Sequence, residues 1–276
     1  MHPYEPLTFM LFFICFSLGT LSYLLFPFSR YEFWGYLGTG LFTLGFIFLT
    51  SNLVLRTIAS GRAPFSNLYE SLLIFTWGIV FFLLMYQYSA RLFLLGTVVA
   101  PLVVVLLLMA AKAHNRITDL MPALKSPWMI YHVSTAIVAY GAFTVSFGLA
   151  VIYLVRDYLE RAFPCHRLLK DLPSLDELDF MIYRAISTGF PFMGLLIITG
   201  AIWADYAWGS YWRWDPKEVW SLITVLIYSI YFHMRFVKKL RGRAGAVIAV
   251  AGFLSVAICY LGVNLVFAGI HSYGSR

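Results

Sequence analysis

The sequence predicts an all-α fold: a polytopic transmembrane helical bundle of about eight spans, with both termini extracytoplasmic. Three observations predict it. Of the 276 residues, 61% are hydrophobic and only 12% are charged, a composition that sets soluble globular classes aside. Apolar stretches of about 20 residues, the length needed to cross a bilayer, recur with short polar segments between them. Lys and Arg cluster between particular stretches, as expected of loops that stay in the cytoplasm.

The expected spans follow one another with little chain between them. They cover residues 7–28, 33–55, 68–88, 92–111, 129–155, 183–204, 219–236 and 244–268. Because the connecting segments are short, no room remains for a separate soluble domain, and residues 1–276 are expected to form one integral membrane domain. The first span lacks a basic leader and a small-residue cleavage site, so it is expected to be retained rather than removed as a signal peptide.

Two of the spans begin with a helix-start signal. Asn67 precedes the third span and Glu70 follows it three residues later. Asp215, Pro216 and Glu218 give the same pattern, with proline at the first helical position, before the seventh span. Capping is therefore the favoured interpretation of these polar side chains.

The basic residues set the predicted orientation. The two clearest clusters follow the fifth and seventh spans: Arg156, Arg161, Arg167 and Lys170, and Lys238, Lys239, Arg241 and Arg243. Both lie on the same side, which is assigned to the cytoplasm. An even number of spans then places both termini outside, together with the loop 205–220. The net charge of +7 is explained by topology and predicts no nucleic-acid partner.

The tryptophan-rich motif, residues 208–220, is the most informative part of the predicted external loops. Its aromatic and acidic residues are Trp208, Tyr211, Trp212, Trp214, Asp215, Glu218 and Trp220. Such a surface suits a large, planar, hydrophobic ligand, because tryptophan supplies extensive rigid contact area. An aromatic belt at the lipid headgroups is the alternative, but belts usually place one or two aromatics at each helix end. The density of this motif exceeds what a belt alone requires.

Three histidines are candidate ligands. His132 and His271 lie at the predicted external ends of the fifth and eighth spans, on the side of the tryptophan-rich motif. Neutral imidazole is a common axial ligand of heme iron, so this pair predicts a six-coordinate site with a porphyrin over the tryptophans. His233 lies near the predicted cytoplasmic end of the seventh span, where it either snorkels to the interface or provides a second, intramembrane ligand.

Other chemistries lack their motifs. The cysteines, Cys15, Cys165 and Cys259, have no short mutual spacing, so the sequence predicts no zinc site, redox pair or C-x-x-C-H heme attachment motif. No hydrolase nucleophile motif and no phosphate-binding glycine loop is present. No residue is assigned a catalytic role.

At these residues the chain resembles the CcsA family, also called ResC, of the system II cytochrome c synthases. The matching runs are 67–71, 132–134, 139–140, 173–179, 183–186, 189–191, 199–201, 208–220, 233–235, 262–264 and 271–274. They occur in the family's order across about two hundred residues. The resemblance implies that Trp208, Trp212, Trp214, Asp215 and Trp220 belong to a heme-binding motif. It also implies that His132 and His271 ligate heme iron externally and that His233 is the intramembrane histidine.

The resemblance implies a function as well. Such a protein handles heme b as cargo, carries it to the extracytoplasmic face and presents it to apocytochrome c, whose C-x-x-C-H thiols add to the heme vinyl groups. A CcsB/ResB-type membrane protein is the expected partner, since no such region is present here. The chain would then be the heme-handling subunit of a cytochrome c heme-lyase complex. It would be surrounded by lipid in a cytoplasmic (inner) or thylakoid membrane.

Two alternatives remain at this point. A CcmC-type heme exporter, which delivers heme to a chaperone, shares the tryptophan-rich motif and two external histidines, but about six spans would favour it. A non-heme membrane anchor or a small-solute transporter is the second alternative, and transporters commonly show inverted repeats that are not visible here.

Overall fold

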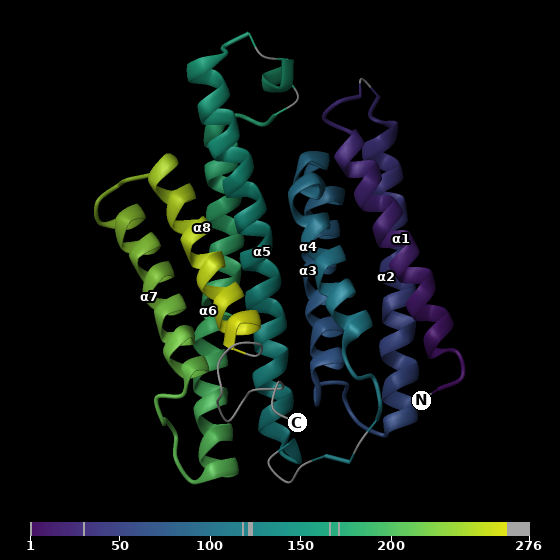
Figure 1. Ribbon diagram of the computed structural model, residues 1–276. Helices are drawn as coiled ribbons and strands as arrows, with labels where there is room; N and C mark the ends of the chain where they lie inside the picture. The colour runs from purple at the N-terminus through teal and green to yellow at the C-terminus, as the bar shows by residue number, and fades with distance from the viewer. Residues whose placement is uncertain are drawn as a thin grey trace. The chain divides into compact units, whose positions relative to one another are not determined.

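The computed structural model describes residues 2–29, 31–117, 119–120, 124–165, 167–170 and 172–263. Within those ranges the chain contains helices and no strand, and eight helices are long and apolar enough to cross a membrane. The predicted all-α fold with about eight spans is confirmed. The chain divides into two compact units, Met1–Asp119 and Leu120–Arg276 (Figure 1). The expected single domain and the extracytoplasmic position of both termini stay predictions.

The first unit is built from four helices. They are α1 (Glu5–Leu25), α2 (Phe33–Ser60), α3 (Leu68–Ala90) and α4 (Phe93–Lys112). Helix α1 packs on α2 and α4, and α3 packs on the same two helices. Fully buried aromatic side chains, including Phe16, Phe42 and Tyr23, fill the space where α1 and α2 meet. Glycines allow the close approach: a Cβ at Gly45 would lie 2.8 Å from the Phe16 ring.

Helix α2 is longer than its sequence pattern predicted. The apolar stretch ends at residue 55, but the helix continues to Ser60 and ends at Gly61, whose φ of +65° forms the left-handed cap. Arg56 was expected in the loop and lies instead inside the helix with no exposed surface. The physical reason is that two buried carboxylates, Glu5 and Glu70, receive its guanidinium.

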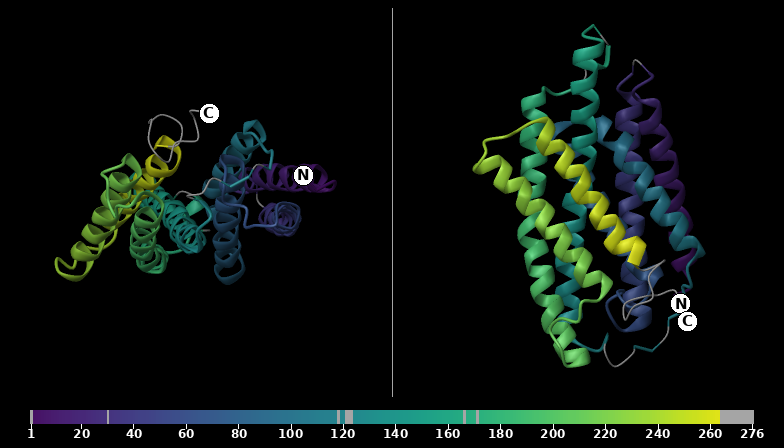
Figure 2. Two further views of the ribbon diagram at one scale, coloured as in Figure 1. Left: turned by 90° about the horizontal axis from the view of Figure 1, so that it is seen from below. Right: turned by 60° about the vertical axis from the view of Figure 1, so that its left-hand side comes forward.

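The described part of the second unit contains four long helices and two short helical turns. They are α5 (Pro127–Ala162), η2 (Arg167–Lys170), α6 (Leu175–Trp208), α7 (Pro216–Phe236), α8 (Arg243–Ala257) and the π-helical turn η3 (Ile258–Gly262). Helices α5 and α6 form the central pair, and α8 packs on α5 and α7. In the views of Figure 2, α7 and α8 cover one side of that pair.

Helices α5 and α6 extend well past their predicted spans, which covered residues 129–155 and 183–204. With 36 and 34 residues they are about 54 and 51 Å long at 1.5 Å per residue, against a hydrocarbon core of about 30 Å. They project beyond the α7–α8 turn (Figures 1 and 2). Polar interactions sustain the extra turns, among them the i,i+4 pair of Arg156 with Glu160 at 2.6 Å and the Ser174 capping box.

A ring stack holds α7 and α8 against α5. Phe143 of α5 and Tyr228 of α7 stack with centroids 3.9 Å apart and planes 12° from parallel. Gly252 of α8 lies under the Tyr228 ring, where a Cβ would come within 2.5 Å. The three helices therefore form one packed frame, and the tryptophan-rich motif lies at the end of this frame where α6 ends and α7 begins, called here the tryptophan end.

Candidate functional site

The tryptophan-rich motif is partly helical. Helix α6 continues through Trp208, because the amide of Gly209 donates to Asp205 at 2.7 Å, and Gly209 then takes the left-handed cap with φ +72°. Helix α7 begins at Pro216, so only residues 209–215 are irregular. The expected loop 205–220 is therefore shorter in the structure, and its two flanks belong to helices.

Two carboxylates fasten this short connection. Asp215 caps α7 by accepting from the amide of Lys217 at 3.0 Å. Glu218 reaches back and accepts at Oε2 from the amides of Arg213 at 2.8 Å and Asp215 at 3.1 Å. The predicted capping box is confirmed, as is the cap of Asn67 on the amide of Glu70 at 2.8 Å. The backbone of the motif is thus fixed, with Trp214 exposed and Trp208, Trp212 and Trp220 half-buried.

Trp214 occupies an unusual backbone conformation. Its φ is +59°, a value that bulky L-residues rarely adopt. Such strain costs about 1–3 kcal/mol and persists only where the surroundings enforce it. Here the amides on both sides of Trp214 are held by Glu218. The result is an indole that is 70% exposed and meets Trp212 edge-on, with ring centroids 5.8 Å apart.

His132 is oriented by helix α6. Its Nδ1 lies 2.9 Å from the carbonyl oxygen of Leu196. A carbonyl can only accept, so Nδ1 carries the proton and the neutral ring keeps its lone pair on Nε2, the atom through which imidazole binds iron. Metal-binding histidines commonly have this second hydrogen bond. Gly200 leaves room for the ring, since a Cβ there would lie 2.8 Å from both Nδ1 and Cε1.

A series of ring contacts connects His132 to the tryptophan-rich motif. The His132 ring lies 5.7 Å from Trp203, and Trp203 lies 5.7 Å from Trp208, with tilted planes in both cases. Sequence reasoning missed Gly200 and Trp203. Their spacing from Leu196, four and then three residues, places all three on one face of α6, which was a detectable signal. Which residue of α5 faces them depends on helix packing that periodicity does not specify.

The other predicted ligands are not gathered around His132. Trp220 lies one turn into α7 and is half-buried. His233 lies near the opposite end of α7, exposed, on the same helix face as exposed Leu226 and Ile230. His271 lies outside the described residues, so the pairing of His132 with His271 stays a prediction. Among the described residues, no three His, Cys, Asp or Glu side chains are grouped to hold a metal ion.

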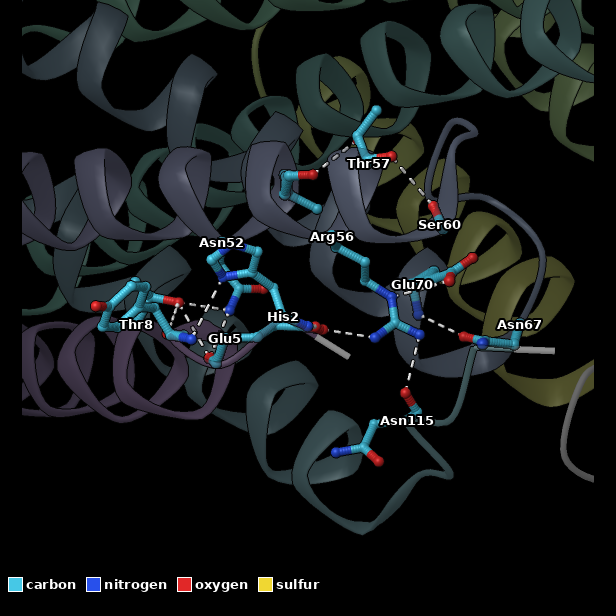
Figure 3. Close-up of polar contacts among 12 residues, drawn as sticks. His2, Glu5, Thr8, Asn52, Arg56, Thr57, Ser60, Asn67, Glu70 and Asn115 are labelled. Atoms are coloured by element: carbon cyan, nitrogen blue, oxygen red, sulfur yellow. Dashed lines mark hydrogen bonds and ion pairs between the residues drawn. The ribbon is translucent and has the colours of Figure 1, made fainter.

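The first unit contains a charged cluster that the sequence did not predict (Figure 3). Arg56 donates to Glu5 at 2.5 Å, to Glu70 at 2.9 Å and to the Asn115 carbonyl at 3.0 Å, and all three charged side chains are fully buried. Arg62 adds a second cation at 3.1 Å from Glu70. The cluster joins the start of α1, the last turn of α2, the start of α3 and the chain beyond α4. These contacts hold the connected helix ends together at that end of the unit.

Comparison with known proteins identifies the family. Residues 65–271 match the model of a family described as cytochrome C assembly protein. The chain is 40% identical over 258 residues to the cytochrome c biogenesis protein CcsA of Guillardia theta, covering 87% of this chain and 86% of that protein. The chain belongs to the CcsA family of cytochrome c assembly proteins. The family resemblance inferred from the motifs is thereby confirmed.

Two other CcsA-family relatives extend the comparison. The CcsA of Chlamydomonas reinhardtii is 40% identical, over 80% of this chain and 64% of that protein. The CcsA of Gloeothece citriformis (strain PCC 7424) is 36% identical, over 86% of this chain and 87% of that protein. With eight apolar helices of membrane-spanning length among the residues that the structure describes, this CcsA-family chain is a multi-pass membrane protein of cytochrome c biogenesis.

A solved structure shares the CcsA-family fold seen here. The cytochrome c heme lyase CcmF superimposes with a TM-score of 0.69 over 95% of this chain. Its sequence identity is 17%, so the likeness is one of fold. The match covers 49% of the CcmF chain, so this protein spans about half of that longer neighbour.

Proposed function

We propose that this CcsA-family chain binds heme b as its substrate at the tryptophan end and presents it for thioether attachment to apocytochrome c. His132 and His271 are the proposed axial ligands, and Trp208, Trp212 and Trp214 provide aromatic contact for the porphyrin. The observation that carries the proposal is the imidazole of His132, whose Nδ1 hydrogen-bonds to the carbonyl oxygen of Leu196 at 2.9 Å while the ring packs against Gly200. This hydrogen bond assigns the proton to Nδ1 and the lone pair of the neutral ring to Nε2.

The aromatic surroundings support heme over a bare metal ion. An isolated ion would need three or four grouped ligands, and none are found among the described residues. Heme brings four equatorial nitrogens of its own, so one or two imidazoles suffice. The contacts from His132 through Trp203 to Trp208, and the exposed Trp214, provide aromatic contact area of the kind that a porphyrin uses.

The proposed attachment chemistry needs positioning more than acid–base catalysis. Each apocytochrome thiol adds across a heme vinyl group: a sulfur–carbon bond forms, the thiol proton ends on the other vinyl carbon, and no electrons are gained or lost. Heme transfer is then a ligand exchange, in which the histidine of the C-x-x-C-H motif replaces His132 or His271 on the iron. Holding the two reactants in register supplies most of the rate gain. The nearby carboxylates Asp215 and Glu218 are already engaged as caps.

The remaining elements of the proposal concern delivery. His233, exposed on an apolar face of α7, is proposed to bind heme within the membrane together with a ligand from a CcsB/ResB-type partner. The tryptophan end is proposed to face the extracytoplasmic side of a cytoplasmic or thylakoid membrane, and the complex to act as a cytochrome c heme lyase. The eight helices and the CcsA relatives favour this function over a six-span exporter or a non-heme anchor.

The test is the visible absorbance of the chain purified with its partner, oxidised and reduced. His132→Ala and His271→Ala are each expected to weaken the heme bands or shift them to five-coordinate character, and the double variant to lose the external heme. His114→Ala, an exposed histidine of the first unit, is the matched control and should match the parent. Unchanged heme binding and cytochrome c maturation in the double variant would refute the external site.

A further inference from the structure

The turn between α7 and α8, called here the basic turn, has a defined structure. It comprises residues 237–242 and exposes Lys238, Lys239 and Arg241. Helix α7 ends with the amides of residues 237 and 238 on the His233 carbonyl, at 2.9 and 3.3 Å, and the amide of Leu240 on the Met234 carbonyl at 3.0 Å. Lys239 takes a left-handed φ of +55° to close the turn.

A buried ion pair anchors the far side of the basic turn. Asp179 of α6 accepts from Arg235 at 2.9 Å and also from the amide of Gly242 at 2.9 Å. The Arg235 guanidinium lies 4.4 Å above the centroid of the Tyr183 ring. Gly242 has φ +75°, and a Cβ there would lie 2.7 Å from the hydroxyl of Tyr153 on α5. The turn is therefore held by α5, α6 and α7 together.

This fixed geometry exceeds what membrane topology requires. Retention of a loop in the cytoplasm depends on the number of basic residues near a span, and flexible loops serve as well as rigid ones. Here a buried carboxylate and a glycine with positive φ specify the backbone from which three exposed cations project. Clustered cations are typical of sites that recognise carboxylate or phosphate groups.

The basic turn also lies close to the exposed imidazole of His233. Helix α7 ends three residues after His233, at Phe236, and the amide of Lys238 lies 3.3 Å from the carbonyl oxygen of His233. His233 shares its helix face with Leu226, Ile230 and Val237, which are 53%, 53% and 63% exposed. An exposed imidazole on an apolar helix face thus lies within one helical turn of the basic turn and its three exposed cations.

We propose that Lys238, Lys239 and Arg241 bind the two propionate carboxylates of a heme whose iron is ligated by His233. The inference rests on the proposed function and names how the intramembrane heme is oriented. Heme carries both carboxylates on one edge of an otherwise apolar disc with iron at its centre, which matches cations at the helix end and imidazole on the apolar face below. An anionic lipid headgroup would use the cations and leave the imidazole without a role.

The first experiment uses the unmodified protein with its partner in nanodiscs of zwitterionic lipid, loaded with either heme or heme dimethyl ester, whose carboxylates are blocked. Dissociation is followed by transfer to a heme-scavenging globin. Blocking the carboxylates removes their contacts with the exposed cations, so the ester is expected to leave about tenfold faster than heme. In the triple variant Lys238→Gln, Lys239→Gln and Arg241→Gln, heme is expected to leave about as fast as the ester.

Two control variants separate the effect of charge in the basic turn from other effects of substitution. Lys170→Gln removes an exposed cation of the same unit outside the basic turn and should keep the preference for heme. Lys238→Arg with Lys239→Arg keeps the charge and should also keep it. Because the ester comparison needs no mutation, a triple variant that fails to fold leaves the test intact.

The outcomes distinguish the inference from the function on which it rests. If His233→Ala leaves heme content unchanged, the intramembrane site is wrong and the inference falls with it. If His233→Ala removes heme but the parent releases heme and its ester equally fast, the intramembrane site stands and the inference is refuted. It is also refuted if the basic turn affects binding only when anionic phospholipid is added, because the turn is then a lipid contact.

Discussion

Replacing Gly200 by alanine is expected to impair heme binding at the tryptophan end while leaving the fold intact. The added Cβ would lie 2.8 Å from Nδ1 and Cε1 of His132, where ordinary contact begins at 3.4 Å. The imidazole must therefore retreat by about 0.6 Å (3.4 − 2.8). The hydrogen bond of Nδ1 to Leu196 is 2.9 Å long, and such bonds weaken beyond about 3.2 Å, so a shift of this size along the bond weakens it substantially.

The two effects of this substitution on the free energy of unfolding nearly cancel. A typical hydrogen bond contributes about 0.5–1.5 kcal/mol to stability. Replacing glycine by alanine inside a helix stabilises the helix by up to about 1 kcal/mol. The melting temperature should therefore change little. Losing the bond that orients a metal-binding histidine typically lowers affinity about 10–100-fold, so the effect should appear in heme binding.

The assay measures heme per protein by absorbance, the melting temperature, and cytochrome c maturation in the same preparations. Gly194→Ala is the matched control, because it lies on the same helix and a Cβ there meets nothing within 4 Å. The control should raise stability slightly and leave heme unchanged. If Gly200→Ala binds heme and supports maturation as well as Gly194→Ala does, the reasoning is refuted, because the orientation of His132 by α6 is then not needed for heme binding.

Three further predictions concern strain and buried charge. Arg56→Met leaves two buried carboxylates without their cation and should cost about 3–5 kcal/mol, seen as loss of folded protein on expression, whereas exposed Arg116→Met should be tolerated. Gly242→Ala, at φ +75°, should lower the free energy of unfolding by about 1–3 kcal/mol, measured by thermal melting. Adding Tyr153→Phe removes the hydroxyl that lies 2.7 Å from the new Cβ, so it should recover only the part of the loss due to that contact. Trp214→Gly should relieve the strain at φ +59° and preserve the melting temperature while lowering heme retention; a fall in melting temperature would contradict this assignment of strain.

The sequence predicted those parts of the fold that depend on local composition. Apolar length identified all eight helices, and the cap residues Asn67 and Asp215 located two helix starts. Helix ends outside the apolar stretches were predicted less well, because there the helix is maintained by specific partners. Arg56 shows this: its helical, buried position depends on Glu5, which is 51 residues away in the chain.

The candidate site was predictable in its residue types and not in its geometry. The sequence indicated His132 and the tryptophans, because the chemistry of imidazole and indole groups is known from the residue types alone. The contact of His132 with Leu196, Gly200 and Trp203 arises from the register of α5 against α6, which depends on packing across 64 residues of chain. Likewise, the left-handed φ of Trp214 follows from two amides held by Glu218, and no propensity rule predicts it for a tryptophan.

The strain at Trp214 makes sense for a site that must release what it binds. A porphyrin enclosed on both faces would be held tightly, but an incoming histidine could not reach the iron. At the tryptophan end, Trp203 is buried beside His132, whereas Trp214 is 70% exposed on a short connection whose backbone is pinned by Glu218. One aromatic contact is therefore part of the packed frame and the other stands at the surface. Under the proposed function, this asymmetry lets the frame hold His132 and the porphyrin in place while the exposed side remains open to the C-x-x-C-H segment.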